Sequence, residues 1–197
     1  ALVADFGDSR VGAVSGELVI RSRANESGST IAEGASFYWR YEKFIRRNES
    51  RANSTVGATG AVYAIRRELF ERIPDDTLLD DVLIPMKIIS RGYRVVFEPA
   101  ALAYDLAAAS PRQEFVRKVR TIAGTFQLFA REQWLFNPFR NRVWFETLSH
   151  KALRLLTPLL HAVILVANVG LLSIPAYRWL LAGQVAFYLA AATALVL

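Results

Sequence analysis

The sequence predicts an α/β domain followed by two membrane-spanning helices, and two observations carry this prediction. Over residues 11–131, segments rich in Val, Ile and Gly alternate with segments of helical periodicity, which is typical of α/β folds. Further along, residues 155–174 and 179–197 form runs of 20 and 19 residues without Asp, Glu, Lys or Arg. At about 1.5 Å per residue, each run is long enough as a helix to cross the roughly 30 Å hydrocarbon core of a bilayer.

The first elements of the α/β part are glycine-containing strands with a helix between them. Residues 11–20, interrupted by Gly12 and Gly16, predict a strand pair or one bent strand to which another backbone comes close. Residues 37–47 place apolar side chains at helical spacing among charges and predict an amphipathic helix. Residues 56–65 return to strand-like composition, so we expect a second strand there.

A helix over residues 79–90, which Gly92 closes, begins with two adjacent carboxylates. Pro85 has no N–H to give to the carbonyl four residues earlier, so Asp81 is expected in or next to the first turn, with Asp80 beside it. One interpretation is structural, because carboxylates at a positive helix end are stabilised by capping and by the helix dipole. The other is general-base catalysis, in which such a carboxylate takes the proton of an incoming hydroxyl.

A buried strand and a long helix come next. Residues 93–97 predict the strand, which Pro99 is expected to end. Ser110 and Pro111 then open a helix over residues 112–131. The expected apolar face of this helix consists of Phe115, Val119, Ile122, Phe126 and Phe129.

The expected second strand contains a short glycine motif. Gly57 and Gly60 leave room for a polar ligand at the backbone, and the Thr59 hydroxyl offers a hydrogen bond. The spacing matches neither a Walker loop nor a dinucleotide fingerprint, and a β-bulge is the alternative interpretation. We treat these three residues as candidates for substrate binding.

Three cations stand close together in the long helix. Arg117 and Arg120 fall on one helical face, with Lys118 beside them. In that arrangement they could hold a diphosphate while negative charge builds on a leaving group. A basic face turned to solvent or to lipid headgroups is the alternative.

The net charge of +6 is concentrated in this helix and in the segment after it. Residues 112–154 carry nine basic groups against three acidic ones, which accounts for the whole excess. Four of the basic side chains come just before the first apolar run, so the positive-inside rule predicts that everything upstream lies in the cytoplasm, at the inner membrane of the cell. These four are Arg140, Arg142, Lys151 and Arg154. No nucleic-acid-binding motif accompanies the surplus, and we expect no nucleic-acid partner.

The chain is expected to divide into three parts, of which residues 1–133 form the cytosolic domain. Residues 134–151 combine Trp, Phe and Arg and predict an amphipathic interfacial helix in the plane of the lipid headgroups, an ordinary connector being the alternative. Residues 152–197 hold the two transmembrane helices, in which His161 and Asn168 indicate either helix packing or a substrate path. Cysteine is absent, which excludes disulfides, thiolate metal sites and cysteine nucleophiles.

Four stretches, taken together, resemble the processive, membrane-embedded branch of family 2 glycosyltransferases, which includes cellulose and hyaluronan synthases. They are GAVSGELVI at 12–20, VGATGAVYAIRRELF at 56–70, LDDVLIPMKIISRGYRVVFEPAALAYD at 79–105 and EFVRKVR at 114–120. The resemblance implies the C-terminal half of a GT-A-type domain. It also implies that the nucleotide-binding half, with Asp-x-Asp ligands for Mg or Mn, precedes residue 1, so this fragment alone is expected to be inactive.

The resemblance implies roles for the candidate residues. The second acid of the family's acidic pair deprotonates the acceptor hydroxyl, which maps onto Asp81, with Asp80 as its neighbour. The family's Gln-Arg-x-Arg-Trp motif, which binds the donor diphosphate, falls on residues 117–121, with Arg117 in place of Gln and Thr121 in place of Trp. The second replacement removes the aromatic ring that would stack on the acceptor sugar, so processivity stays open.

The expected activity is inverting transfer of a hexose from a nucleoside-diphosphate sugar to a glycan or a lipid-linked acceptor, in polysaccharide synthesis. The expected partners are this donor, the acceptor and membrane lipids. The expected cofactor is divalent Mg or Mn, held by ligands outside these residues. Two alternatives stay open: a non-processive lipid-linked sugar transferase, and a non-catalytic membrane scaffold in which the acids cap helices and the basic run binds anionic lipid.

Overall fold

The computed structural model of the protein describes residues 1–21, 30–106, 108 and 110–196. The chain forms two compact units, Ala1–Ser149 and His150–Leu197. The three-part division that we expect at residues 133 and 151 stays a prediction.

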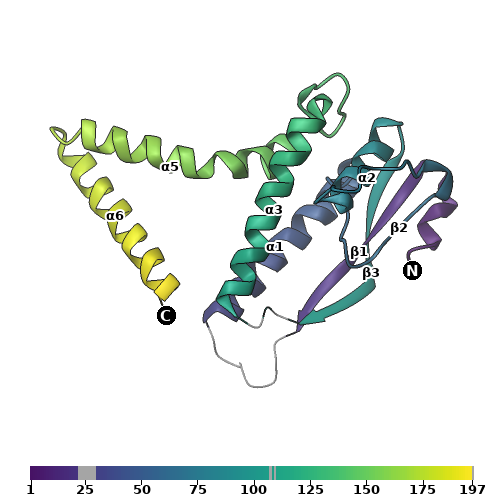
Figure 1. Ribbon diagram of the computed structural model, residues 1–197, viewed down its shortest axis with the longest axis horizontal. Helices are drawn as coiled ribbons and strands as arrows, with labels where there is room; N and C mark the ends of the chain where they lie inside the picture. Colours follow the sequence, from purple (N-terminus) through teal and green to yellow (C-terminus); the bar gives the residue numbers. More distant parts are fainter. Residues whose placement is uncertain (22–29, 107, 109, 197) are drawn as a thin grey trace. The chain divides into compact units, whose positions relative to one another are not determined.

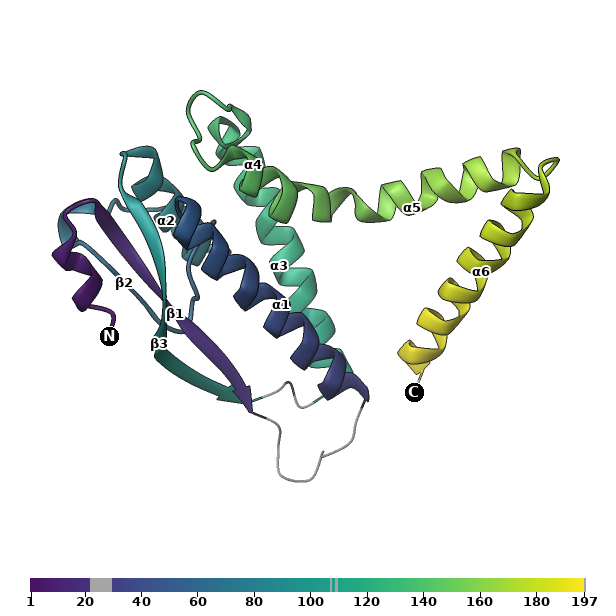
Figure 2. The same ribbon diagram turned by 180° about the vertical axis from the view of Figure 1, so that it is seen from behind.

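The first unit alternates strands and helices, in agreement with the predicted α/β class. Its elements in chain order, with η for a 3-10 helix, are η1 (Ala4–Gly7), β1 (Val11–Arg21), α1 (Thr30–Ala52), β2 (Tyr63–Ile65), η2 (Arg67–Leu69), α2 (Asp80–Ser90), β3 (Arg94–Leu106), α3 (Pro111–Arg131), η3 (Gln133–Phe136) and α4 (Trp144–Thr147). The described strands form one sheet in the order β2-β1-β3. Helix α1 packs against β3, and α2 packs against β1 and β3. Figure 1 and Figure 2 show both helices alongside this sheet.

Strand β1 is one bent strand rather than a strand pair. It pairs antiparallel with β2, which places Ser15 opposite Tyr63, and parallel with β3. The register with β3 shifts at Gly12 and at Gly16. A Cβ atom on Gly16 would collide with the carbonyl oxygen of Ala101. The predicted close backbone approach is therefore confirmed at Gly16, whereas a Cβ atom on Gly12 would collide with side-chain atoms of Ile88, Leu69 and Tyr93.

The entry to β1 is fixed by a short-range ion pair. Asp8 accepts a hydrogen bond from the Arg10 guanidinium, with Nη2 2.9 Å from Oδ2. The side-chain hydrogen bonds from Arg10, followed by the bond from its backbone N–H, lower the pKa of Asp8 to about 2. The preceding turn is held by Arg66, whose Nη2 donates to the carbonyl oxygen of Phe6 at 2.8 Å.

Helix α2 begins and ends where the sequence predicts. Its first residue is Asp80, and Gly92 follows its last turn with φ of +90°, a backbone conformation that favours glycine. The middle of the helix supplies much of the core, since Met86 and Ile88 are fully buried together with Val14 of β1.

Two predicted strands differ from the observed ones. Within residues 56–65 only Tyr63–Ile65 is a strand, because Gly57 leaves the extended conformation with φ of +93°. Strand β3 does not end at Pro99, as the sequence predicts, but extends to Leu106. Strand β3 is the last strand of the described sheet, and Pro99 lies between the two stretches of β3 that pair with β1. The N–H that proline lacks is therefore not needed for a hydrogen bond between β1 and β3.

Residues 134–151 do not form the single interfacial helix that we expect. The segment consists of the short helices η3 and α4, a loop between them, and a π-helical turn η4 (Leu148–Ala152). Asn141 organises the loop, because its Nδ2 donates to the carbonyl oxygen of Leu135 at 2.9 Å and to Oγ1 of Thr147 at 3.1 Å. Aromatic and basic composition left an amphipathic helix and an ordinary connector as alternatives, and the loop that this buried amide organises agrees with the connector.

Arg142 in this segment donates hydrogen bonds to the backbone of the first unit. Its Nη1 donates to the carbonyl oxygen of Gly92 at 3.1 Å, and its Nη2 donates to that of Tyr93 at 2.6 Å. Burial, and secondly the positive charge of Arg94, lower the pKa of Arg142. The guanidinium therefore ties the end of the first unit to the start of β3.

The second unit is a hairpin of two helices, α5 (Leu153–Gly170) and α6 (Pro175–Val196). Its polar side chains bond to each other: Asn168 Nδ2 donates to Gln184 Oε1 at 2.9 Å, and Nδ1 of His161 lies 3.1 Å from the Tyr188 hydroxyl. These contacts favour the helix-packing interpretation of His161 and Asn168.

One helical stretch in the described part of the chain, Trp144–Gly170, is long and apolar enough to cross a membrane. It contains most of the first predicted span. The second predicted span, residues 179–197, stays a prediction.

Candidate functional site

The acidic pair lies in the first turn of α2, and the loop before β2 packs against it. Pro85 cannot bond to the carbonyl of Asp81 within the helix, which leaves that oxygen without its usual partner. The backbone N–H of Ala58 donates to it instead, at 2.7 Å. The same proline that sets the beginning of the helix thus also creates an attachment point for the loop.

Both glycines of the loop touch Asp81. A Cβ atom on Gly57 would lie 3.2 Å from the carbonyl oxygen of Asp81 and 3.2 Å from Cγ2 of Val82. A Cβ atom on Gly60 would lie 3.0 Å from Oδ2 of Asp81. The sequence predicts that these glycines admit a polar ligand to the backbone. The structure explains them by the close packing of the loop against Asp81. A Cβ atom at either position would force Asp81 or Val82 to shift, so glycine lets the loop come this close to Asp81 without displacing it.

Thr59 lies in the same loop and is held from two sides. Its N–H donates to Ser15 Oγ at 2.8 Å, and its Oγ1 accepts from Nη1 of Arg46 at 2.9 Å. Thr59 is 9% exposed and Ser15 is fully buried. The hydroxyl that we expect to contact substrate is therefore engaged within the protein, by two residues that the sequence analysis does not single out.

The two acids differ in exposure. Asp80 is exposed, whereas Asp81 is half-buried beside the loop. Both belong to the first turn of α2, where the helix dipole favours negative charge. Tyr63 is a further neighbour: burial raises its pKa, and the negative charges of Asp80 and Asp81 raise it further. The phenol therefore stays protonated at neutral pH.

The three cations of the basic run project from α3. Arg117, Lys118 and Arg120 are exposed, and Nζ of Lys118 lies 3.8 Å from Oε1 of Glu114 on the same helix. Helix α3 meets the segment before α2 further along: a Cβ atom on Gly124 would lie 2.6 Å from Cγ of Leu79.

Gly124 is the point on α3 from which the positions of Arg117 and Arg120 along the helix can be counted. At 1.5 Å per residue, Arg120 lies about 6 Å and Arg117 about 10 Å from Gly124 along the axis of α3. Spacings of four and seven residues keep both on the side of the helix that carries Gly124. The structure thus brings Gly57, Gly60 and Asp81 into contact. Arg117 and Arg120 lie on α3 one to two turns before Gly124, the residue that meets Leu79 next to the acidic pair.

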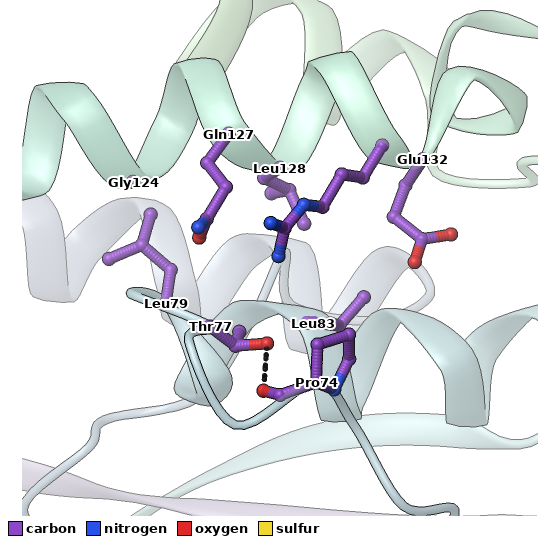
Figure 3. Close-up of a pocket in the computed structure, with 9 residues that line it drawn as sticks. Pro74, Thr77, Leu79, Leu83, Gly124, Gln127, Leu128 and Glu132 are labelled. Atoms are coloured by element: carbon purple, nitrogen blue, oxygen red, sulfur yellow. Dashed lines mark hydrogen bonds between the residues drawn. The ribbon is translucent and has the colours of Figure 1, made fainter.

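A small hollow lies between α3 and the segment that leads into α2. Figure 3 shows Gln127 projecting from α3 toward Thr77 and Leu79, and Gln127 Oε1 accepts from the N–H of Leu78 at 2.9 Å. The hollow measures about 20 Å³, room for about one water molecule and far too little for a nucleotide sugar. We therefore regard it as a packing feature beside the candidate site.

The described residues alone do not supply a cage for a divalent cation. Such a cation takes several oxygen ligands, and within the described ranges no three His, Cys, Asp or Glu side chains gather in one place. Asp80 and Asp81 offer two adjacent carboxylates without a third. We derive no step of the chemistry through a metal on these residues.

A family model described as glycosyl transferase family group 2 matches residues 1–196. Among solved structures, the chain is similar to a mannosyltransferase, PcManGT from Pyrobaculum calidifontis in complex with GDP-Man and Mn2+, with 25% sequence identity and a TM-score of 0.51. The match covers 98% of this chain and 55% of the other, so the chain spans about half the length of that mannosyltransferase. A search of curated proteins gives no match. Because the family model covers almost the entire sequence, the chain belongs to glycosyl transferase family group 2.

Proposed function

We propose that the complete protein transfers a sugar from a nucleoside-diphosphate sugar to a hydroxyl group of a glycan or a lipid-linked acceptor. The observation that carries the proposal is the half-buried carboxylate of Asp81 in the first turn of α2, held by a glycine loop in a chain of this family. GDP-Man is the first donor to test, because the similar mannosyltransferase binds it.

The proposed chemistry is a single displacement. The Asp81 carboxylate takes the proton from the acceptor hydroxyl, whose oxygen forms a bond to the anomeric carbon of the donor sugar. The bond from that carbon to the diphosphate breaks, and the diphosphate leaves with the bonding electrons. Attack opposite to the leaving group inverts the anomeric configuration. Arg117, Lys118 and Arg120 stabilise the charge on the diphosphate, which requires their α3 surface to face the bound donor.

A divalent cation, Mg or Mn, is proposed as cofactor of the complete enzyme. The Mn2+ in the similar mannosyltransferase supports this, and we assign its ligands to residues other than those described. A cation of this kind neutralises diphosphate charge when bound.

We also propose that the protein works at the inner membrane, with its first unit in the cytoplasm. The apolar stretch Trp144–Gly170 supports membrane insertion, and residues 179–197 are the proposed second span. Side chains of α3 add exposed apolar surface, since Phe115 and Phe126 are 61% and 57% exposed. Basic residues around α3 and before the first span favour the cytoplasmic side.

The acceptor and the length of the product define two versions of this function. Polysaccharide synthesis, as in cellulose and hyaluronan synthases, is our first proposal. A single transfer to a lipid-linked acceptor is favoured by one observation. Thr121 stands where cellulose and hyaluronan synthases have Trp, and its hydroxyl donates to the carbonyl oxygen of Arg117 at 3.0 Å. Position 121 therefore carries no aromatic ring that could stack on a growing glycan chain.

The test uses the complete protein in membranes with a panel of radiolabelled nucleoside-diphosphate sugars. We expect one donor to give labelled product, and the size of the product separates a polymer from a single added sugar. If no donor gives labelled product but the protein binds vesicles that contain anionic lipid, the non-catalytic membrane scaffold is favoured instead.

A further inference from the structure

Arg46 connects helix α1 with the loop that touches the acidic pair. Its Nη1 donates to Thr59 Oγ1 at 2.9 Å, and its Nε donates to Oε1 of Glu42, one turn earlier in α1, at 3.3 Å. The side chain of Arg46 is 19% exposed, so most of it is packed between the helix and the loop. A planar guanidinium donates to both acceptors from a rigid fork, whereas an ammonium group on a flexible stem does not fix their geometry.

The loop is fastened at three successive residues. Ala58 donates to the carbonyl oxygen of Asp81, Thr59 is held by Ser15 and Arg46, and Gly60 lies against the Asp81 carboxylate. Because Thr59 lies directly between the two residues that touch Asp81, we expect a shift of Thr59 to move both contacts. Arg46 on α1 is thus connected through Thr59 to the loop that touches Asp81 on α2.

Other contacts hold α1 on the sheet without Arg46. Glu17 of β1 binds Nζ of Lys43 at 2.6 Å and Nη2 of Arg47 at 3.4 Å. Near the end of the helix, Arg94 of β3 donates to the carbonyl oxygen of Ser50 at 2.7 Å. Removal of the Arg46 guanidinium should therefore loosen the loop while α1 stays docked.

We infer that Arg46 is a positioning residue of the active site, which holds residues 58–60 through Thr59 and so fixes the Asp81 carboxylate for proton transfer. The inference rests on the proposed function for its kinetic consequence. Its structural part, the connection from Arg46 through Thr59 to Asp81, stands on the contacts alone. A reacting group displaced by about 1 Å can cost as much as about a hundredfold in rate.

The kinetic test compares four variants of the complete protein in membranes: Arg46→Met, Thr59→Val, Thr59→Ser and the double variant Arg46→Met/Thr59→Val. We expect kcat to fall about tenfold in the two single variants that remove the hydrogen bond, with the KM for the donor within about twofold of wild type. Thr59→Ser keeps the hydroxyl and should retain most of kcat. The double variant should be much less impaired than the product of the two single effects, because both single variants remove the Arg46–Thr59 bond. Thr59→Val also removes the bond that Ser15 Oγ donates to Thr59 Oγ1 at 3.2 Å, so it should be the slower of the two.

The matched control is Arg51→Met, which removes an exposed guanidinium from the last turn of the same helix. It should leave kcat unchanged. If kcat in Arg46→Met equals that of the control, or if the effects of the two single variants multiply in the double variant, the positioning role is refuted.

Amide hydrogen exchange separates a failure of this inference from a failure of the proposed function. In Arg46→Met, amides of residues 58–62 should exchange faster than in wild type, while those of residues 43–50 stay protected. If wild type transfers no sugar but this exchange pattern appears, the function fails and the connection through Thr59 stands. Unchanged exchange at residues 58–62 refutes the connection whatever the activity.

Discussion

Replacement of Gly57 by alanine tests whether the loop conformation and its closeness to α2 are both required. Gly57 and Gly92 have nearly the same backbone angle, with φ of +93° and +90°. An L-residue at such an angle costs about 1–2 kcal/mol, offset by about 0.4–1 kcal/mol because alanine restricts the unfolded chain. Both terms apply equally to Gly92→Ala, where the new Cβ would meet nothing within 4 Å.

The crowding differs between the two positions. At Gly57 the new Cβ would lie 3.2 Å from the carbonyl oxygen of Asp81 and 3.3 Å from Cα of Val82, backbone atoms that cannot rotate away. Overpacking of this kind adds about 1–3 kcal/mol. We therefore expect Gly92→Ala to destabilise by about 1 kcal/mol and Gly57→Ala by about 2–4 kcal/mol.

The assay is thermal unfolding of the purified protein in detergent, with both variants and wild type measured side by side. At about 2–4 °C per kcal/mol, Gly92→Ala should lower Tm by about 3 °C and Gly57→Ala by about 6 °C or more. If the two variants unfold at the same temperature, the contact of Gly57 with the start of α2 contributes nothing and the geometry of the loop is wrong.

Three further perturbations address the carboxylate, the structural arginine and the ion pair at the entry to β1. A methyl group at Gly60 would lie 3.0 Å from Oδ2 of Asp81, so Gly60→Ala should lower kcat about tenfold with little change in Tm; unchanged turnover would contradict the contact. Arg142→Met should lower the free energy of unfolding by about 1 kcal/mol, because it removes two hydrogen bonds from a guanidinium to backbone carbonyls, whereas Arg140→Met, at an equally exposed position nearby, should change it by less than about 0.5 kcal/mol. Asp8 has a pKa lowered to about 2 by its arginine neighbour, so its stabilising contribution is present above pH 3.8 and disappears as the pH falls toward 2. The stability difference between wild type and Asp8→Asn, followed by denaturant unfolding across that window, should shrink with falling pH, and a difference that grows would contradict the ion pair.

Elements set by local backbone rules could be predicted from the sequence. Pro85 set the first turn of α2, and with it the position of Asp81, because a missing N–H acts within four residues. Gly92 set the end of the same helix, and Ser110 accepts a hydrogen bond from Gln113 N at 3.3 Å at the start of α3, as its position before a proline predicts.

Elements set by distant contacts could not be predicted. Residues 56–62 have the composition of a strand, yet Thr59 bonds to Ser15, 44 residues earlier, and Ala58 bonds to Asp81. The charge of Arg142 indicated a lipid neighbour, whereas its partners are carbonyls about 50 residues away. The position of a polar group in the sequence does not reveal which distant backbone will need it.

The candidate site shows the same division. The acidic pair and the glycines were found because they form short motifs with a known physical meaning. Arg46 and Tyr63 were missed, since one is an ordinary charge within an amphipathic helix and the other a single aromatic residue in a strand. Only the packing of α1 against the loop brings Arg46 to Thr59, and only the fold brings Tyr63 within electrostatic reach of the acids.

The central claim is that the Asp81 carboxylate takes the acceptor proton, and the complete protein with Asp81→Asn tests it most directly. The amide has the same shape but cannot accept that proton at neutral pH. The account predicts that transfer falls by about a hundredfold or more, while donor binding, measured with a non-transferable donor analogue, stays within about twofold of wild type. Asp80→Asn, the matched change at the exposed neighbour, should retain more activity than Asp81→Asn. Undiminished turnover in Asp81→Asn, or loss of donor binding equal to the loss of transfer, would contradict the account.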